Sequence, residues 1–365
     1  CMSSSDEEDD EELPEGEVVR RVALDIGSAI TKCVVADISA GRILSVVLAQ
    51  EAPCSYQVDL QQSASHQLSK RVQDRGLQVL RMFAEQASEL GATQGIFIAT
   101  GAFRRAENGA ECITRITREL GIRVTRASVG EEGRLSMRTA RACSDDSWAG
   151  MCWDAGETAF QICARTSDCT AEDGKGVVGF MSSIGPGDTC RACIELIQGR
   201  QVASCATPNP VSKADAAALV RHVQSSLPPV PTWLQGSTDV LAIGGTSSIF
   251  HLAAQLAHLV GAVEPSKDGQ PAAATLYTGT DRVCWESSDL WLCLEFICMR
   301  TDEQLQALLA GTGDEVIDVT RAVAKLALLY AVVAHCGLPR LTYHPTYGLC
   351  PGILTSEHLY APEGV

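Results

Sequence analysis

The sequence is short of positive charge. Among its 365 residues, 29 lysines and arginines face 45 aspartates and glutamates, which gives a formal net charge of −16 at pH 7. A chain this acidic lacks the broad basic surface that binds nucleic acid or anionic membranes. We therefore expect small ligands and proteins as partners, with no nucleic acid and no membrane, and leave a homodimer open.

Long hydrophobic runs are missing as well. The longest apolar candidate, residues 326–333, lies between Lys325 and His335 and is far shorter than the roughly 20 residues that a membrane span needs. It predicts a buried helix, which we place at residues 316–335. No positively charged and then apolar leader opens the chain, so we expect a cytoplasmic protein. Because the first residue is Cys1, an incomplete N-terminus and an organellar address are left open.

The cysteines and histidines lack the spacing of a disulfide framework or a zinc site. The 16 cysteines are scattered along the chain, which indicates reduced intracellular thiols. Cys190 and Cys193 form a single pair with no second pair or histidine at ligand spacing, which is typical of structural cysteines. His251 and His258 are typical of packed or capping residues. No Ser-His-Asp arrangement can be read from the spacing.

Apolar residues are nevertheless abundant enough for a large core. They make up 45% of the chain, with a mean hydropathy of +0.06, which excludes a fully disordered or fibrous protein. The length favours two or three domains. Residues 1–17 differ, because nine acids crowd between Asp6 and Glu17 with almost nothing to bury. They predict a disordered acidic tail.

Two similar hairpins are predicted far apart in the chain. Residues 22–28 and 30–36 are β-rich runs joined by a Gly-Ser turn, with Asp25 near the tip. A second run carries Asp154-Ala155-Gly156 and returns through residues 160–163. The repetition favours a duplicated α/β fold in which each half offers an acid and a tight glycine turn to one cleft. The alternative is two unrelated surface hairpins.

A third glycine turn supports phosphate binding. Residues 240–243 read as a buried strand that runs into Gly244-Gly245-Thr246 and then into a helix at 249–259. A strand, a glycine turn and a helix N-terminus together suit a phosphate group, although a plain strand-to-helix turn has the same pattern. Two aspartates facing each other beside such turns suit a hydrated divalent cation. The sequence therefore predicts phosphate chemistry.

The order of the motifs resembles the Ppx/GppA family of exopolyphosphatases and guanosine pentaphosphate phosphohydrolases, which belongs with actin and the sugar kinases. The resemblance spans about residues 20–356. Its segments are the two Asp-x-Gly motifs, Ala99-Thr100-Gly101-Ala102-Phe103-Arg104, Ser128-Val129-Gly130-Glu131-Glu132-Gly133-Arg134-Leu135, and the closing Tyr347-Gly348-Leu349 with Gly352-Ile353-Leu354.

The resemblance implies an α/β fold with two actin-like, ribonuclease H-like lobes around a central phosphate-binding cleft. The first lobe is expected over residues 18–145 and the second over 146–365, with the last segment returning to the first lobe. Glu132 would activate the attacking water, and Arg104 would line the cleft. Mg²⁺ would be held by Asp25, Asp154 and Gln161. The expected phosphate-binding residues are Gly27, Ser28, Lys32, Gly156, Thr158, Gly244, Gly245 and Thr246.

Several positions depart from the family pattern. Ala29-Ile30 replace Asn-Ser, Cys350-Pro351 replace Arg-Glu, and Gln161 replaces a glutamate. Glu157 stands where the family has glycine and adds repulsion toward phosphate unless it points away or binds a metal.

These features leave three hypotheses. The leading one is a Mg²⁺-dependent phosphohydrolase that releases terminal phosphate from inorganic polyphosphate or from guanosine penta- or tetraphosphate, with Glu132 as the base. The second is a catalytically weakened polyphosphate- or nucleotide-binding regulatory protein. The third is a phosphotransferase of the wider superfamily.

Overall fold

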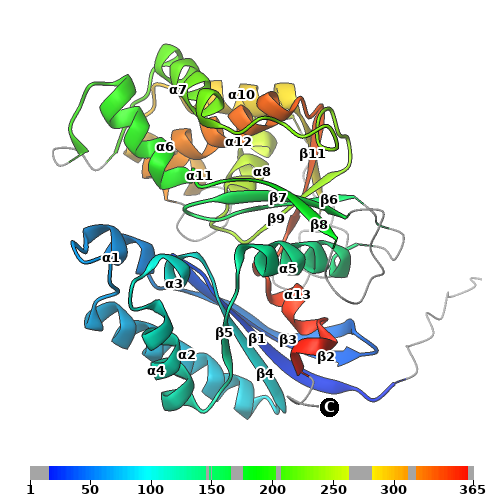
Figure 1. Ribbon diagram of the computed structural model, residues 1–365. Helices are drawn as coiled ribbons and strands as arrows, with labels where there is room; N and C mark the ends of the chain where they lie inside the picture. The colour runs from blue at the N-terminus through cyan, green and yellow to red at the C-terminus, as the bar shows by residue number, and fades with distance from the viewer. Residues whose placement is uncertain are drawn as a thin grey trace, which may run out of the picture.

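Two mixed β-sheets, one in each half of the chain, organise the computed structural model (Figure 1). The structure describes residues 16–144, 148, 150–165, 176–202, 207–262, 282–310 and 318–360, so nearly all of the predicted acidic tail lies outside the described residues. Helices accompany both sheets, and the two-lobed α/β fold expected from the sequence is confirmed.

The first sheet is built around the first predicted hairpin. Its strand order is β3-β2-β1-β4-β5. The strands are β1 (Val19–Ile26), β2 (Ile30–Ser39), β3 (Arg42–Pro53), β4 (Gln94–Ala99) and β5 (Val124–Arg126). Strands β1 and β2 pair antiparallel with Asp25 opposite Lys32, and β4 runs parallel to β1. β3 pairs with β2 along its whole length, which places Glu51 opposite Lys32.

Helices from the first half of the chain pack on both sheets. They are α1 (Tyr56–Gln62), α2 (Lys70–Glu89), α3 (Gly101–Arg105), α4 (Gly109–Leu120) and α5 (Val129–Ala142). α2 begins after Ser69, whose side chain accepts a hydrogen bond from the Val72 amide and caps the helix. α5 packs on strands of the second sheet, so it fills the space between the two lobes (Figure 1).

The second sheet repeats the hairpin. Its strand order is β10-β11-β9-β6-β7-β8. The strands are β6 (Met151–Ala155), β7 (Phe160–Arg165), β8 (Val177–Ser182), β9 (Val240–Gly244), β10 (Val283–Glu286) and β11 (Arg340–Pro345). Strands β6 and β7 pair antiparallel with Asp154 opposite Gln161, and β9 runs parallel to β6. Each lobe therefore carries its acid at the same place, on the first strand just before the turn.

The helices of the second lobe surround one long apolar helix. They are α6 (Pro186–Ala192), η1 (Cys193–Ile197), α7 (Lys213–Ser226), α8 (Ile249–Leu259), α10 (Ser287–Ile297), α11 (Asp302–Leu309), η4 (Val319–Arg321) and α12 (Ala322–Cys336). η4 and α12 together span 18 residues and are long and apolar enough to cross a membrane by length and composition, but 72% of the stretch is buried in the protein. It packs against α6, α7, α8 and α10, as the core helix of a lobe does.

The extent of this stretch differs from its prediction. The buried helix expected over 316–335 begins at Ala322, after the short turn of η4, and the expected start at 316 lies outside the described residues. The apolar stretch is longer than the run at 326–333 suggested, because alanines and the buried Lys325 extend it toward the N-terminus.

The end of the chain packs on the first sheet. After β11, the helices α13 (Cys350–Leu354) and α14 (Glu357–Tyr360) lie against β1, β2 and β4. Arg21 of β1 donates to the Leu354 carbonyl at 3.1 Å and pairs with Glu357 at 2.7 Å. The last two helices of the chain thereby connect the second lobe to the first sheet, next to the Asp25 hairpin.

Candidate active site

A cavity of about 630 Å³ lies between the two lobes and is lined by residues of both. The turns after β1, β6 and β9 meet there, as the sequence predicts. All but one of the predicted site residues line this cavity. They are Asp25, Gly27, Ser28, Lys32, Arg104, Glu132, Asp154, Gly156, Thr158, Gln161, Gly244 and Gly245. The exception is Thr246, whose hydroxyl donates a hydrogen bond to Glu51 of β3 at 2.8 Å.

The two hairpin acids share one partly buried cation. Asp25 Oδ2 lies 3.9 Å from Lys32 Nζ and accepts a hydrogen bond from the Leu349 amide at 3.2 Å. Burial raises the pKa of Asp25 and of Asp154, while Lys32 lowers both. For Lys32 itself, burial lowers the pKa, but Asp25, Glu51 and Asp154 raise it and prevail. Lys32 therefore stays charged and compensates the acids around it.

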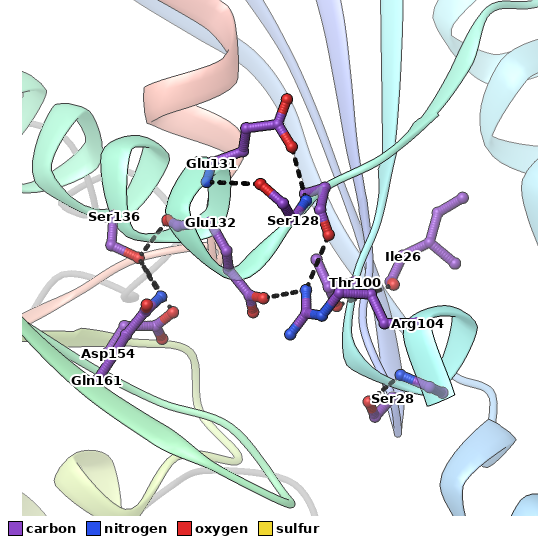
Figure 2. A network of polar contacts seen from close by, with 12 residues as sticks. Ile26, Ser28, Thr100, Arg104, Ser128, Glu131, Glu132, Ser136, Asp154 and Gln161 are labelled. Carbon is purple, nitrogen blue, oxygen red and sulfur yellow. Dashed lines mark hydrogen bonds and ion pairs between the residues drawn. The ribbon is translucent and has the colours of Figure 1, made fainter. Parts of the chain in front are cut away.

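Gln161 contacts this acid cluster through a serine. Its amide nitrogen donates to Ser136 Oγ at 3.3 Å, and Ser136 Oγ lies 3.2 Å from Asp154 Oδ2 and 2.9 Å from the Glu132 carbonyl (Figure 2). The Gln161 side-chain oxygen is 3.9 Å from Cys163 Sγ. The amide that the sequence assigned to the metal is thus engaged by protein groups, and it orients Ser136 toward Asp154.

Two adjacent glutamates on α5 take different positions. Glu131 forms a capping box with Ser128: its amide donates to Ser128 Oγ at 3.2 Å, and its carboxylate accepts from the Ser128 amide at 2.6 Å. Glu132 instead faces the cavity and pairs with Arg104, which also donates to the Ala127 carbonyl at 3.0 Å (Figure 2). Glu131 therefore caps the start of α5, and Glu132 is left facing the cavity.

The environment of Glu132 suits proton transfer at neutral pH. Burial raises its pKa from 4.5 to about 7, opposed by Arg104 and reinforced by the charges of Asp154 and Asp25. A general base works best when its pKa lies near the operating pH. Glu132 meets this condition and is also held in one orientation by a cation.

Two of the predicted glycine turns use a glycine amide within the turn itself. The amide of Gly27 donates to the Ile30 carbonyl at 3.1 Å, and the amide of Gly156 donates to Ala159 at 2.9 Å, so both close their own turns. Two hydroxyl groups lie close to these turns. Ser28 Oγ and Thr158 Oγ1, one from each lobe, lie 3.0 and 3.8 Å from the position of a Cβ at Gly101. Ser28 Oγ already accepts the Ala102 amide at 3.0 Å.

A second group of charges on the cavity wall was not predicted. Glu157 pairs with Arg321 at the end of η4 and so points away from the phosphate turns, one of the two ways of avoiding repulsion that the sequence left open. Lys325 of α12, only 5% exposed, donates to the Ser247 carbonyl at 3.0 Å. A single lysine inside an apolar helix was the available signal for Lys325. There was no such signal for Arg321, because nothing in its local sequence indicates a contact with Glu157.

The acids fit a magnesium ion that keeps several of its waters. Within the described ranges, no three His, Cys, Asp or Glu side chains lie together as a metal-binding group. Asp25 and Asp154 are two hard oxygen donors, and burial disfavours their negative charge. A cation bound beside them would stabilise the charged carboxylates. Mg²⁺ is commonly held by one or two carboxylates, waters and substrate phosphates.

The sequence matches a known family over part of its length. The model of the Ppx/GppA phosphatase family matches residues 34–156. None of the curated protein sequences matches the chain.

Solved structures resemble nearly the whole chain. A Ppx/GppA family member from Aquifex aeolicus is 18% identical with a TM-score of 0.66, covering 94% of this chain and 98% of its own. An exopolyphosphatase from Cytophaga hutchinsonii is 16% identical with a TM-score of 0.68, covering 93% and 97%. Nucleoside triphosphate hydrolases from Neospora caninum are 10% identical with a TM-score of 0.52, covering 93% and 92%. The family model matches about a third of the chain, and the solved structures share its two-lobed fold.

Proposed function

We propose that this protein is a magnesium-dependent phosphohydrolase that releases the terminal phosphate of inorganic polyphosphate or of guanosine penta- or tetraphosphate. The observation that carries the proposal is Glu132, a carboxyl group with a pKa of about 7 that faces the interlobe cavity beside two further acids. The match to the family model and the similarity of the fold to that of a solved exopolyphosphatase support phosphoanhydride hydrolysis as the reaction type.

Glu132 is the proposed base for the attacking water. The water gives its proton to the Glu132 carboxylate while its oxygen bonds to the terminal phosphorus. The bond from that phosphorus to the bridging oxygen breaks, and the electron pair leaves with the shortened chain. Arg104 holds the Glu132 carboxylate in place. Magnesium, when bound at Asp25 and Asp154, would neutralise charge on the phosphate groups.

A binding or regulatory protein with weakened catalysis is the second candidate. Gln161 favours it, because an amide stands where the family has a glutamate and is engaged with Ser136. Such a protein would bind the same ligands and close around them without releasing phosphate.

Replacement of the two adjacent glutamates separates the candidates. We expect Glu132→Gln to lower kcat for phosphate release by about 100-fold to 10,000-fold, the usual contribution of a general base. Glu131→Gln is the matched control: it removes the same charge one residue away, keeps a side chain that a capping box accepts, and should cost less than about 1 kcal/mol of stability with little loss of rate. Phosphate release would be measured from pyrophosphate, long-chain polyphosphate and guanosine pentaphosphate, with and without magnesium. No release by the native chain, with ligand binding retained, favours the regulatory protein.

A further inference from the structure

One wall of the cavity carries a cation that the chain's own carboxylates already engage. Arg321 pairs with Glu157, and its Nε also lies 3.5 Å from Asp318 Oδ2. One helical turn further on, Lys325 is buried and bound to the Ser247 carbonyl. Two cations and two acids of this group line the cavity: Arg321, Lys325, Glu157 and Asp318. The charges of these four side chains cancel, so together they present no net positive charge to an anionic ligand.

Glu157 faces this wall and not the catalytic acids. Its Oε1 lies 3.6 Å from the position of a Cβ at Gly187, in α6 of the second lobe. The next residue, Thr158, has its hydroxyl near Gly101 of the first lobe. Consecutive side chains of one turn therefore face opposite sides of the cavity. A ligand phosphate near Thr158 would lie one residue away from the Glu157 carboxylate.

We infer that Glu157 is a specificity-determining residue that limits how many phosphate groups the cavity accepts. Its carboxylate holds Arg321, the cation that a further phosphate of a longer chain would bind, and its own charge repels that phosphate. A short ligand that contacts only the side of the cavity formed by Asp25, Lys32 and Asp154 does not contact Glu157. The inference rests on the proposed function, because it takes a phosphoanhydride as the ligand of this cavity.

The inference predicts a change that depends on ligand length. Glu157→Gln keeps the shape of the side chain and leaves Arg321 and Lys325 opposed by Asp318 alone. Affinity for long-chain polyphosphate should rise about tenfold, which corresponds to about 1.4 kcal/mol, while affinity for pyrophosphate stays within about twofold. Adding Arg321→Gln to Glu157→Gln should cancel the gain, which a purely structural role of Glu157 would not produce.

Binding of pyrophosphate and of long-chain polyphosphate would be measured by titration calorimetry with magnesium present, in the full chain carrying Glu132→Gln. Glu89→Gln, an exposed glutamate outside the cavity, removes the same unit of charge and should change neither affinity. The inference is overturned by an equal gain for both ligands, by no gain, or by no binding of long-chain polyphosphate to any variant. Phosphate release by the native chain is recorded separately. Release without a Glu157 effect rejects only this inference, and a Glu157 effect without release rejects only the proposed hydrolase.

Discussion

The charge balance of the cavity depends on one side chain, Lys32. Lys32 belongs to β2, and its charge opposes the effect of burial, which would otherwise push Asp25 and Asp154 toward their neutral forms. Removing one partner of a buried charge cluster leaves the others uncompensated, and this costs more than the intact cluster contributes. Lys32 therefore stabilises the fold as well as the proposed site.

Lys32→Met tests this role in stability. We expect the free energy of unfolding to fall by about 3 kcal/mol near neutral pH. Without the lysine, the folded-state pKa of Asp25 and Asp154 rises further above the unfolded value, so the folded state binds more protons. The loss should therefore be larger at about pH 8 than at about pH 5.

Urea unfolding across pH provides the measurement for Lys32→Met. Lys213→Met is the control, because Lys213 pairs with Glu295 at 3.5 Å but is 61% exposed. Such a surface pair contributes at most about 1 kcal/mol. Equal losses for the two variants, or a loss that does not change with pH, would show that Lys32 does not compensate buried acids.

At the scale of elements, the turn before α13 depends on the absence of a side chain at Gly348. Its φ is +56°, and a Cβ there would meet Asp25 Oδ2 and lie 2.9 Å from Lys32 Nζ. The same turn places the Leu349 amide on Asp25. The closing motif of the chain thus fixes the acid of the first hairpin from 324 positions away in sequence.

Gly348→Ala should separate collision from backbone strain. We expect a loss of about 3 kcal/mol, because the methyl group adds overpacking against Asp25 and Lys32 to the left-handed backbone penalty. Gly121→Ala carries a similar φ of +67° with nothing within 4 Å and should lose only about 1 kcal/mol. Thermal unfolding measures both. Comparable losses would mean that the close approach at Gly348 has no consequence.

The elements that sequence predicts well here are those with local signals. Both Asp-x-Gly hairpins, the strand at β9 and the helix α8 follow from strand alternation, turn residues and helical spacing. The pairing of Glu157 with Arg321 could not be predicted, because 164 positions separate them and no local pattern joins them. The hydrogen bond of Thr246 could not be predicted for the same reason, since its partner Glu51 belongs to the other lobe.

The sequence predicted many of the residues that line the cavity, but it could not predict their pKa values or hydrogen-bond partners. The order of motifs singled out Glu132, but only burial by the folded chain moves its pKa close to neutrality. Likewise, the glycines of the turns were correctly placed at the cavity, whereas the use of their amides within the turns depends on backbone geometry.

At the scale of the whole molecule, several polar contacts bridge the lobes around the cavity. The Thr246–Glu51 hydrogen bond joins the turn after β9 to the first sheet, and the Leu349–Asp25 bond joins the closing segment to the first hairpin. A ligand that contacts both lobes should stabilise them together. This coupling is a property of the assembled cavity and of neither lobe alone.

Ligand binding should therefore raise the unfolding temperature of the whole protein. At a ligand concentration of about 100 Kd, the gain in stability is about 2.7 kcal/mol. We expect pyrophosphate with magnesium to shift the complete calorimetric transition of both the native chain and Glu132→Gln, and sulfate at equal ionic strength to shift neither. A shift confined to one part of a split transition would show that the ligand binds one lobe only.

The pH dependence of kcat/KM tests the central claim most directly, because it reports the ionisation of the free protein's base. With a pKa of about 7 for Glu132, the base is protonated at lower pH, so kcat/KM for phosphate release should rise through about pH 7 and level off above it. The remaining rate of Glu132→Gln should lack this rise. A native profile that is flat between about pH 5 and 8, or a rise centred where an ordinary glutamate ionises, would contradict the assignment of Glu132 as the base.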